Sequence, residues 1–97
     1  MILELADIRI QPGQQSAFEE AIQRGIDQVI RHATGFISCR VQHGIESPER
    51  YLLMIEWETL ENHTVDFRES PAFQTWRSIV GSFFAMPPVV EHFSLLS

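Results

Sequence analysis

The chain contains four histidines, whose side chains titrate near neutral pH: His32, His43, His63 and His92. No two have the four-residue helical spacing of a ready metal-binding pair, and no Cys-x-x-Cys motif is present, so we predict no metal site from local motifs. His63 or His92 could act as a general base on a ligand with an acidic hydroxyl group. The simpler alternative for each is a single hydrogen bond at a sheet edge or a subunit seam.

One charged pair is also a candidate. Glu56 is predicted to lie in the middle of a strand on an apolar face, where a charge is unfavourable unless it is paired. Arg40, on the preceding predicted strand, is the expected partner, and its planar guanidinium suits an anionic ligand. The pair could therefore orient a ligand or fix the register of a dimer, and we favour the structural role.

Aromatic residues are plentiful, with seven Phe, two Trp and one Tyr among 97 residues. Trp57, Phe67 and Trp76 belong to the part of the chain where they concentrate, and the helical spacing there is first of all that of a hydrophobic core. The same side chains could line a flat cavity for an aromatic ligand. Cys39 lies within a predicted strand and resembles a packing residue more than a nucleophile.

The elements that must position these residues follow from hydrophobic periodicity, which is close to two in strands and between three and four in helices. Pro12-Gly13 and Gly35 bound the first helix, and Thr59 and Ser70-Pro71 are predicted to start the later helices. The predicted strands are Ile2–Ile10, Phe36–His43, Arg50–Glu58 and Val89–Leu96, and the predicted helices are Gly13–His32, Leu60–Arg68 and a segment from Pro71 to Met86.

This order is βαββαβ, with the second helical element split in two. It predicts an α+β, ferredoxin-like split-βαβ fold over residues 1–97, as a single domain. Right-handed crossovers place the helices on one face of a four-stranded antiparallel sheet. Several strands, however, are apolar on both faces, as Leu3 and Leu5 are opposed to Ile8 and Ile10. We therefore expect a homodimer that pairs through the open sheet face, the alternative being a monomer with a few exposed aliphatic residues.

The composition narrows the classes of partner. The net charge of −6 disfavours nucleic acid, and all seven basic residues are Arg. A single cysteine allows no intrachain disulfide, and the chain starts without a secretory signal pattern. No apolar stretch approaches the roughly 20 residues that span a bilayer. We therefore expect a cytoplasmic protein with neither a nucleic-acid nor a membrane partner.

Two segments carry a family resemblance. One is the run Glu56–His63, in which a strand ends in a Trp with acidic neighbours before a short helix, and the other is Ser70-Pro71-Ala72-Phe73. With the opening strand and the segment from Pro87 to Phe93, they make nearly the whole chain resemble the antibiotic biosynthesis monooxygenase domains. The resemblance implies a dimeric α+β barrel, in which two sheets pack face to face.

The resemblance also implies several activities. Some members oxidise aromatic phenols with molecular oxygen and no bound cofactor, others oxidise quinols or degrade haem, and many have no assigned activity. The haem-degrading members use an Asn on the first strand, which Leu5-Ala6-Asp7 lacks. The step from Trp57 to Ser70 is slightly longer than in many members, so side chains of the short helix cannot be matched one by one.

Two functional hypotheses follow. The first is a cofactor-independent monooxygenase for a small electron-rich phenol or quinol, with His63 or His92 as base, Arg40 stabilising the anion, and aromatic walls from Trp57, Phe67 and Trp76. The second is a non-catalytic dimeric ligand-binding or accessory protein of the same fold. A haem-binding or haem-degrading protein is a third alternative, less favoured than these two. The first two differ in whether polar side chains converge on an enclosed cavity.

Overall fold

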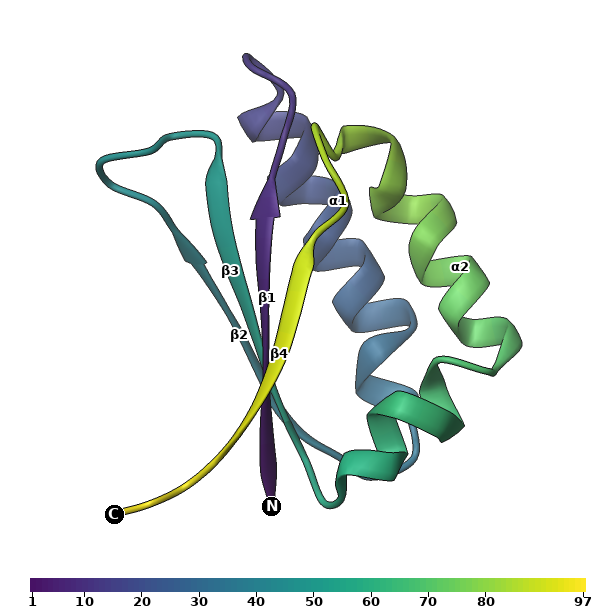
Figure 1. Cartoon of the computed structure of the whole chain (residues 1–97). Helices are drawn as coiled ribbons and strands as arrows, with labels where there is room; N and C mark the ends of the chain where they lie inside the picture. Colours follow the sequence, from purple (N-terminus) through teal and green to yellow (C-terminus); the bar gives the residue numbers. More distant parts are fainter.

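The computed structural model describes residues 1–97 as one antiparallel sheet covered on one face by helices (Figure 1). The strand order is β2-β3-β1-β4, with β1 and β3 in the centre. The elements are β1 (Ile2–Arg9), α1 (Gln15–Gln28), a 3₁₀ turn (Ile30–His32), β2 (Phe36–His43), β3 (Arg50–Trp57), a π-helix (Asn62–Phe67), α2 (Pro71–Val80), a 3₁₀ turn (Gly81–Phe83) and β4 (Val89–Ser94).

The predicted α+β, ferredoxin-like fold is confirmed, and the differences lie at the ends of elements. β1 ends at Arg9, and Ile10 makes only an isolated bridge to Phe84. β4 ends at Ser94 and not at Leu96, because Ser94 pairs with Ile2, the first residue of β1. Beyond that pair the final residues have no strand to bond to. None of the helices has the length and apolar character needed to cross a bilayer.

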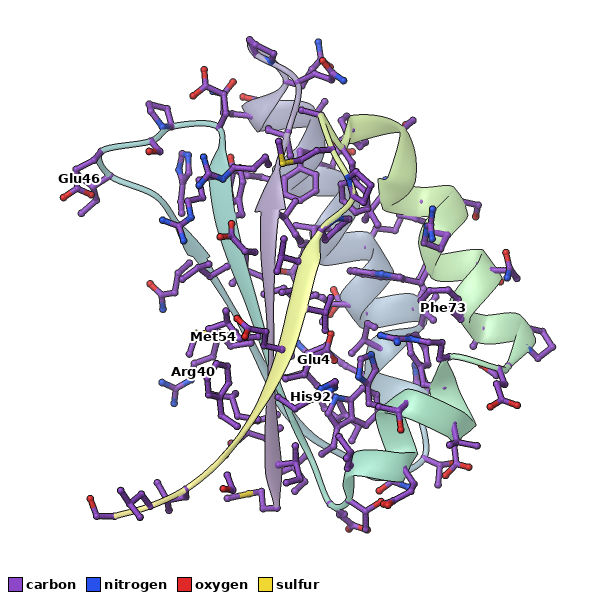
Figure 2. The ribbon with its side chains drawn as sticks, viewed as in Figure 1. Glu4, Arg40, Glu46, Met54, Phe73 and His92 are labelled. Carbon is purple, nitrogen blue, oxygen red and sulfur yellow. The ribbon has the colours of Figure 1, made fainter.

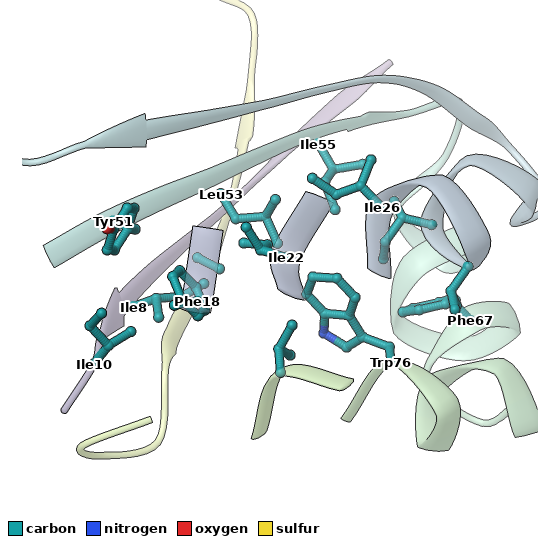
Figure 3. Packing of buried hydrophobic residues seen from close by; sticks show 14 of the residues in the cluster. Ile8, Ile10, Phe18, Ile22, Ile26, Tyr51, Leu53, Ile55, Phe67 and Trp76 are labelled. Atoms are coloured by element: carbon teal, nitrogen blue, oxygen red, sulfur yellow. The ribbon is translucent and has the colours of Figure 1, made fainter. Parts of the chain in front are cut away.

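The core lies between the sheet and the two helices (Figure 3). Gly25 is buried on α1 where that helix meets α2. A Cβ atom at Gly25 would lie 2.7 Å from the Trp76 ring, closer than side-chain atoms pack. Glycine therefore lets the two helices approach at this point, although it is a poor helix former.

The predicted short helix after β3 forms, but most of it is a π-helix. Thr59 caps it as predicted: Thr59 Oγ1 accepts from the Asn62 N–H at 3.2 Å, and Asn62 Oδ1 accepts from the Thr59 N–H at 3.0 Å. The backbone N–H of Arg68 donates to the carbonyl of His63 at 3.1 Å, the wider spacing of a π turn. His63 and Phe67 are the two buried residues of this segment, so both face the sheet.

No helix covers the second face of the sheet. Figure 2 shows Arg40 and Met54 on this open face, away from the helices. Val89 and Phe93 of the edge strand β4 are 58% and 46% exposed. The predicted Arg40–Glu56 pair does not form. The register sets Arg40 opposite Met54 and Ser38 opposite Glu56, so the Ser38 hydroxyl donates to Glu56 Oε1 at 2.6 Å.

Candidate functional site

A cavity of about 720 Å³ lies between the sheet and the helical layer formed by the π-helix and α2. This volume is within the range of small-molecule sites, roughly 300 to 1,000 Å³. Most of its lining is hydrophobic. Four charged or titratable side chains also face it: Glu4, His63, Arg68 and Arg77.

Glu4 is the unusual residue of this cavity, because it is a carboxylate in the middle of the central strand β1 and only 5% exposed. The indole Nε1–H of Trp57 donates to Glu4 Oε1 at 3.0 Å, and His63 Nε2 lies 3.3 Å from the same oxygen. Burial raises the pKa of Glu4 from 4.5 to about 7, against the opposing effects of the Trp57 hydrogen bond and the Arg68 charge. Glu4 therefore changes charge near neutral pH.

His63 reaches Glu4 from the π-helix and is almost fully buried. Its ring stacks on Trp57, with 5.4 Å between ring centroids and 20° between planes. Its Nδ1 lies 2.8 Å from Nε2 of His92. Burial, helped by the charges of Arg68 and His92, lowers the pKa of His63 from 6.5 to about 4. Burial and Arg68 also lower the pKa of His92, so both rings are neutral at pH 7.

The sheet register explains how this cluster forms. Glu4 is paired with His92 on one side and with Ile55 on the other, and Trp57 is the next residue of β3 on the same face. Glu4 and His92 therefore stand side by side and point toward the helices (Figure 2). The π-helix then brings His63 onto both of them.

Two guanidinium groups complete the site. Arg68 follows the π-helix and Arg77 lies on α2, and both are exposed, which places them at the mouth of the cavity. Neither forms an ion pair with a carboxylate of the protein, and Arg77 lies 5.9 Å over the ring of Phe73. Their charges are therefore available to an anionic or oxygenated ligand. No group of three or more His, Cys, Asp or Glu is arranged to hold a metal ion.

The residues predicted to form the site do not all reach the cavity. His63, Phe67 and Trp76 line it. Trp57 is fully buried behind His63, and His92 touches His63 from β4 without lining the cavity. Arg40 lies on the opposite face of the sheet, because strand residues at alternate positions point to opposite sides.

Sequence reasoning missed Glu4, Arg68 and Arg77. Glu4 shares its strand face with Ala6 and Ile8, and an acidic residue within such an apolar face signals a paired or functional carboxylate. That signal was present in the sequence. Arg68 carried no comparable signal, because an arginine at the end of a short polar helix is ordinary for a protein surface.

Comparisons with known proteins agree on the family. The sequence profile of the antibiotic biosynthesis monooxygenase family matches residues 1–78. A Bordetella bronchiseptica protein whose crystal structure is named after this family is 41% identical, with a TM-score of 0.93 over 99% of this chain and 97% of that one. The uncharacterized protein YczJ of Bacillus subtilis is 37% identical over 93 residues, which are 96% of this chain and 97% of YczJ.

A more distant structure shares the fold alone. It is a monooxygenase of Streptomyces coelicolor, from the gene ActVA-Orf6, in complex with the ligand nanaomycin D. It is 18% identical, with a TM-score of 0.83 over 99% of this chain and 88% of that one. The family profile and the two closer relatives together show that this chain belongs to the antibiotic biosynthesis monooxygenase family.

Proposed function

We propose that this protein is a cofactor-independent monooxygenase that acts on a small electron-rich aromatic substrate, a phenol or a quinol. The observation that carries the proposal is the convergence of Glu4, His63, Arg68 and Arg77 on one otherwise apolar cavity. A protein that uses this space only as a core would fill it with side chains and keep charged groups out of it.

The proposed reaction converts a phenol and one O₂ into a quinone and one water. A base takes the hydroxyl proton, and the resulting anion supplies the electrons that reduce oxygen. One oxygen atom ends on the ring and the other leaves as water, so substrate carbon is oxidised and no other reductant is needed. The protein binds the ring, stabilises its anion and excludes bulk water.

The side chains of the site are divided among these tasks. Phe67 and Trp76, with Trp57 behind them, form the aromatic wall. The guanidinium for the anion, expected from Arg40, comes in this proposal from Arg68, which faces the cavity. The residues that would transfer the proton are those around His63, and they include His92, which is hydrogen-bonded to it. The Streptomyces coelicolor monooxygenase supports the proposal to the extent that its fold is the same.

A second function has its own observation in its favour. The ring nitrogens of His63 both face protein groups, since Nδ1 is hydrogen-bonded to His92 and Nε2 lies 3.3 Å from Glu4 Oε1, an arrangement that favours a structural role for His63. A ligand-binding or accessory protein would need no base. Turnover is the property that separates these two functions.

We also propose that a second copy of the chain covers the open sheet face. Leu3, Leu5, Leu52 and Met54 are only partly buried there, and Val89 and Phe93 extend the apolar surface onto β4. Sedimentation velocity at micromolar concentration tests this assembly, and a monomer at all concentrations would rule it out.

Oxygen uptake tests the enzymatic function. Wild-type protein would be assayed with a panel of hydroquinones and polyphenols, beside His63→Ala and His92→Ala. Arg40→Gln is the matched control, since it removes a positive charge from the opposite face of the sheet. We expect uptake with at least one phenol, a loss of tenfold or more in both histidine variants, and wild-type rates in the control. No uptake above background across the panel would favour the binding protein.

A further inference from the structure

We infer that Glu4 is the group that takes the proton from a ligand in the cavity, and that His63 and His92 link Glu4 to the protein surface as a proton relay. The inference rests on the proposed function, which it deepens by assigning the base. It gives the two histidines a different task from that of the base, since neither of them would take the proton from the ligand.

The contacts of Glu4 point to the carboxylate as the base. Trp57 and His63 both approach Oε1, which leaves Oε2 without a protein partner. No fully buried side-chain oxygen or nitrogen in the structure lacks a hydrogen-bond partner. Oε2 therefore has access to open space, and Glu4 lines the cavity. Both ring nitrogens of His63 lie close to a protein group, Nδ1 at 2.8 Å from Nε2 of His92 and Nε2 at 3.3 Å from Glu4 Oε1, whereas Oε2 has no such neighbour.

The contacts of the histidines form a continuous path from Oε1 to the surface. Glu4 Oε1 lies 3.3 Å from Nε2 of His63, and Nδ1 of His63 lies 2.8 Å from Nε2 of His92. His92 is on the edge strand β4 and only partly buried, and its Nδ1 has no protein partner. The path therefore starts at a cavity and ends at water.

In the proposed relay the protons have two arrangements, and in both of them the 3.3 Å contact between Oε1 and Nε2 of His63 tightens to a hydrogen bond. When Glu4 is ionised, Nε2–H of His92 donates to Nδ1 of His63, and Nε2–H of His63 donates to Oε1. When Oε1 carries a proton, it donates to Nε2 of His63, and Nδ1–H of His63 donates to Nε2 of His92. The second arrangement holds one more proton than the first, and that proton enters or leaves at Nδ1 of His92.

Proton transfer from a bound phenol starts from this second arrangement and leaves the number of protons in the relay unchanged. The phenol O–H bond breaks and an O–H bond forms at Oε2 of Glu4. The proton on Oε1 moves to Nε2 of His63, the proton on Nδ1 of His63 moves to Nε2 of His92, and Nδ1 of His92 releases one proton to water. One proton enters the relay and one leaves it, and no electron moves. The phenolate that remains is stabilised by Arg68 and Arg77.

The charged and titratable groups around Glu4 are few. His63 of the π-helix contacts it, His92 of β4 is its strand neighbour, the charge of Arg68 lowers its pKa, and Arg77 of α2 faces the same cavity. Across the sheet, burial and, after it, the charge of Glu4 raise the pKa of the Cys39 thiol on β2 to about 11. The thiol therefore stays protonated near neutral pH. Glu4 is the one carboxyl group in this set, and it titrates there.

Nitrogen-15 NMR of histidine-labelled protein tests the relay without any turnover. Between pH 9 and pH 5, we expect His63 and His92 to change together from the Nε2–H to the Nδ1–H tautomer. The ratio of the two forms should change by about tenfold per pH unit below the pKa of Glu4. Neither ring should become cationic near pH 7. In Glu4→Gln the switch should disappear, whereas Glu56→Gln, which removes a carboxylate from the other face, should keep it.

The outcomes separate the relay from the enzymatic function. Tautomers that stay constant from pH 9 to pH 5 in wild-type protein would overturn the relay, even if Glu4→Gln fails to fold. So would two rings that switch at different pH values. A joint switch in a protein that consumes no oxygen with any phenol would leave the relay standing and would instead contradict the proposed function.

Discussion

Replacing Glu4 by Gln should make the protein more stable at alkaline pH, although it removes a hydrogen-bonded side chain from the core. Folding buries the carboxyl group and raises its pKa from 4.5 to about 7. The folded state therefore holds the Glu4 proton more tightly than the unfolded state does between these pH values. The contribution of Glu4 to stability is greatest below pH 4.5 and is lost as the pH rises through about 7, a loss of roughly 3 kcal/mol.

His63 acts in the opposite direction. Its pKa is lowered from 6.5 to about 4, so folding disfavours its cation, and stability rises as the pH increases from 4 to 6.5. In the wild type this gain and the loss from Glu4 largely cancel over their common range. In Glu4→Gln only the gain remains. The free energy of unfolding of the variant, relative to wild type, should therefore increase by roughly 3 kcal/mol between pH 4.5 and pH 8.

Urea denaturation at a series of pH values measures this difference. Trp57 and Trp76 are both buried, so their fluorescence reports unfolding. Glu56→Gln gives the baseline for the removal of one strand carboxylate from the other sheet face. If the difference between Glu4→Gln and wild type stays constant from pH 4.5 to pH 8, then Glu4 is not held in a state that resists ionisation, and the account of the site is wrong.

Three further substitutions test the packing around the site. Gly25→Ala should destabilise the fold by about 1 to 3 kcal/mol, although alanine is the better helix former, because its Cβ meets the Trp76 ring; thermal unfolding measures this. Trp57→Phe removes the N–H donor to Glu4 and should destabilise the fold by about 2 to 4 kcal/mol in urea titrations. The loss should be larger at pH 8.5 than at pH 5, because Glu4 is protonated at pH 5. An equal loss at both pH values would contradict the role of the carboxylate. Ser70→Ala removes the cap of α2 and should lower stability by about 1 kcal/mol, which Ser70→Asp should restore in the same assay.

The fold could be predicted because its signals are local. Strand alternation, the Pro12-Gly13 break and the Ser70-Pro71 cap each depend on neighbours in the sequence, and each appears in the structure at or near its predicted place. The ends of strands were predicted less well, because a strand stops where its partner stops. Ser94 ends β4 only because β1 begins at Ile2.

The site was harder to predict because it depends on register. Arg40 and Glu56 looked like partners on adjacent strands, but the observed register sets Arg40 opposite Met54, two residues from Glu56. An irregularity in the register lies between Phe36 and Ser38, after which Ser38 is opposite Glu56. Predicted and observed partners of Arg40 differ by two residues along β3, so Arg40 and Glu56 share a sheet face without being opposite each other.

Glu4 illustrates the opposite case. It lies on the same face of β1 as Ala6 and Ile8, and the sequence contained no information on which residues would contact it there. Trp57 and His63, which bond it, come from a strand and a helix more than half the chain away. Long-range pairing of this kind leaves no trace in periodicity, because periodicity reports only on the faces of one element.

The π-helix at Asn62–Phe67 also bears on how the chain is aligned with its relatives. A π turn holds one residue more than an α turn, so a single inserted residue can be absorbed there without moving the two ends of the segment. Counting forward from Trp57 therefore gives the wrong counterpart of His63 in any relative whose segment is a residue shorter. The proper counterpart is the residue whose side chain stacks on the tryptophan and contacts the strand carboxylate. A family alignment built on these contacts would group proteins by the chemistry of the cavity, whereas one built on spacing alone would mix them.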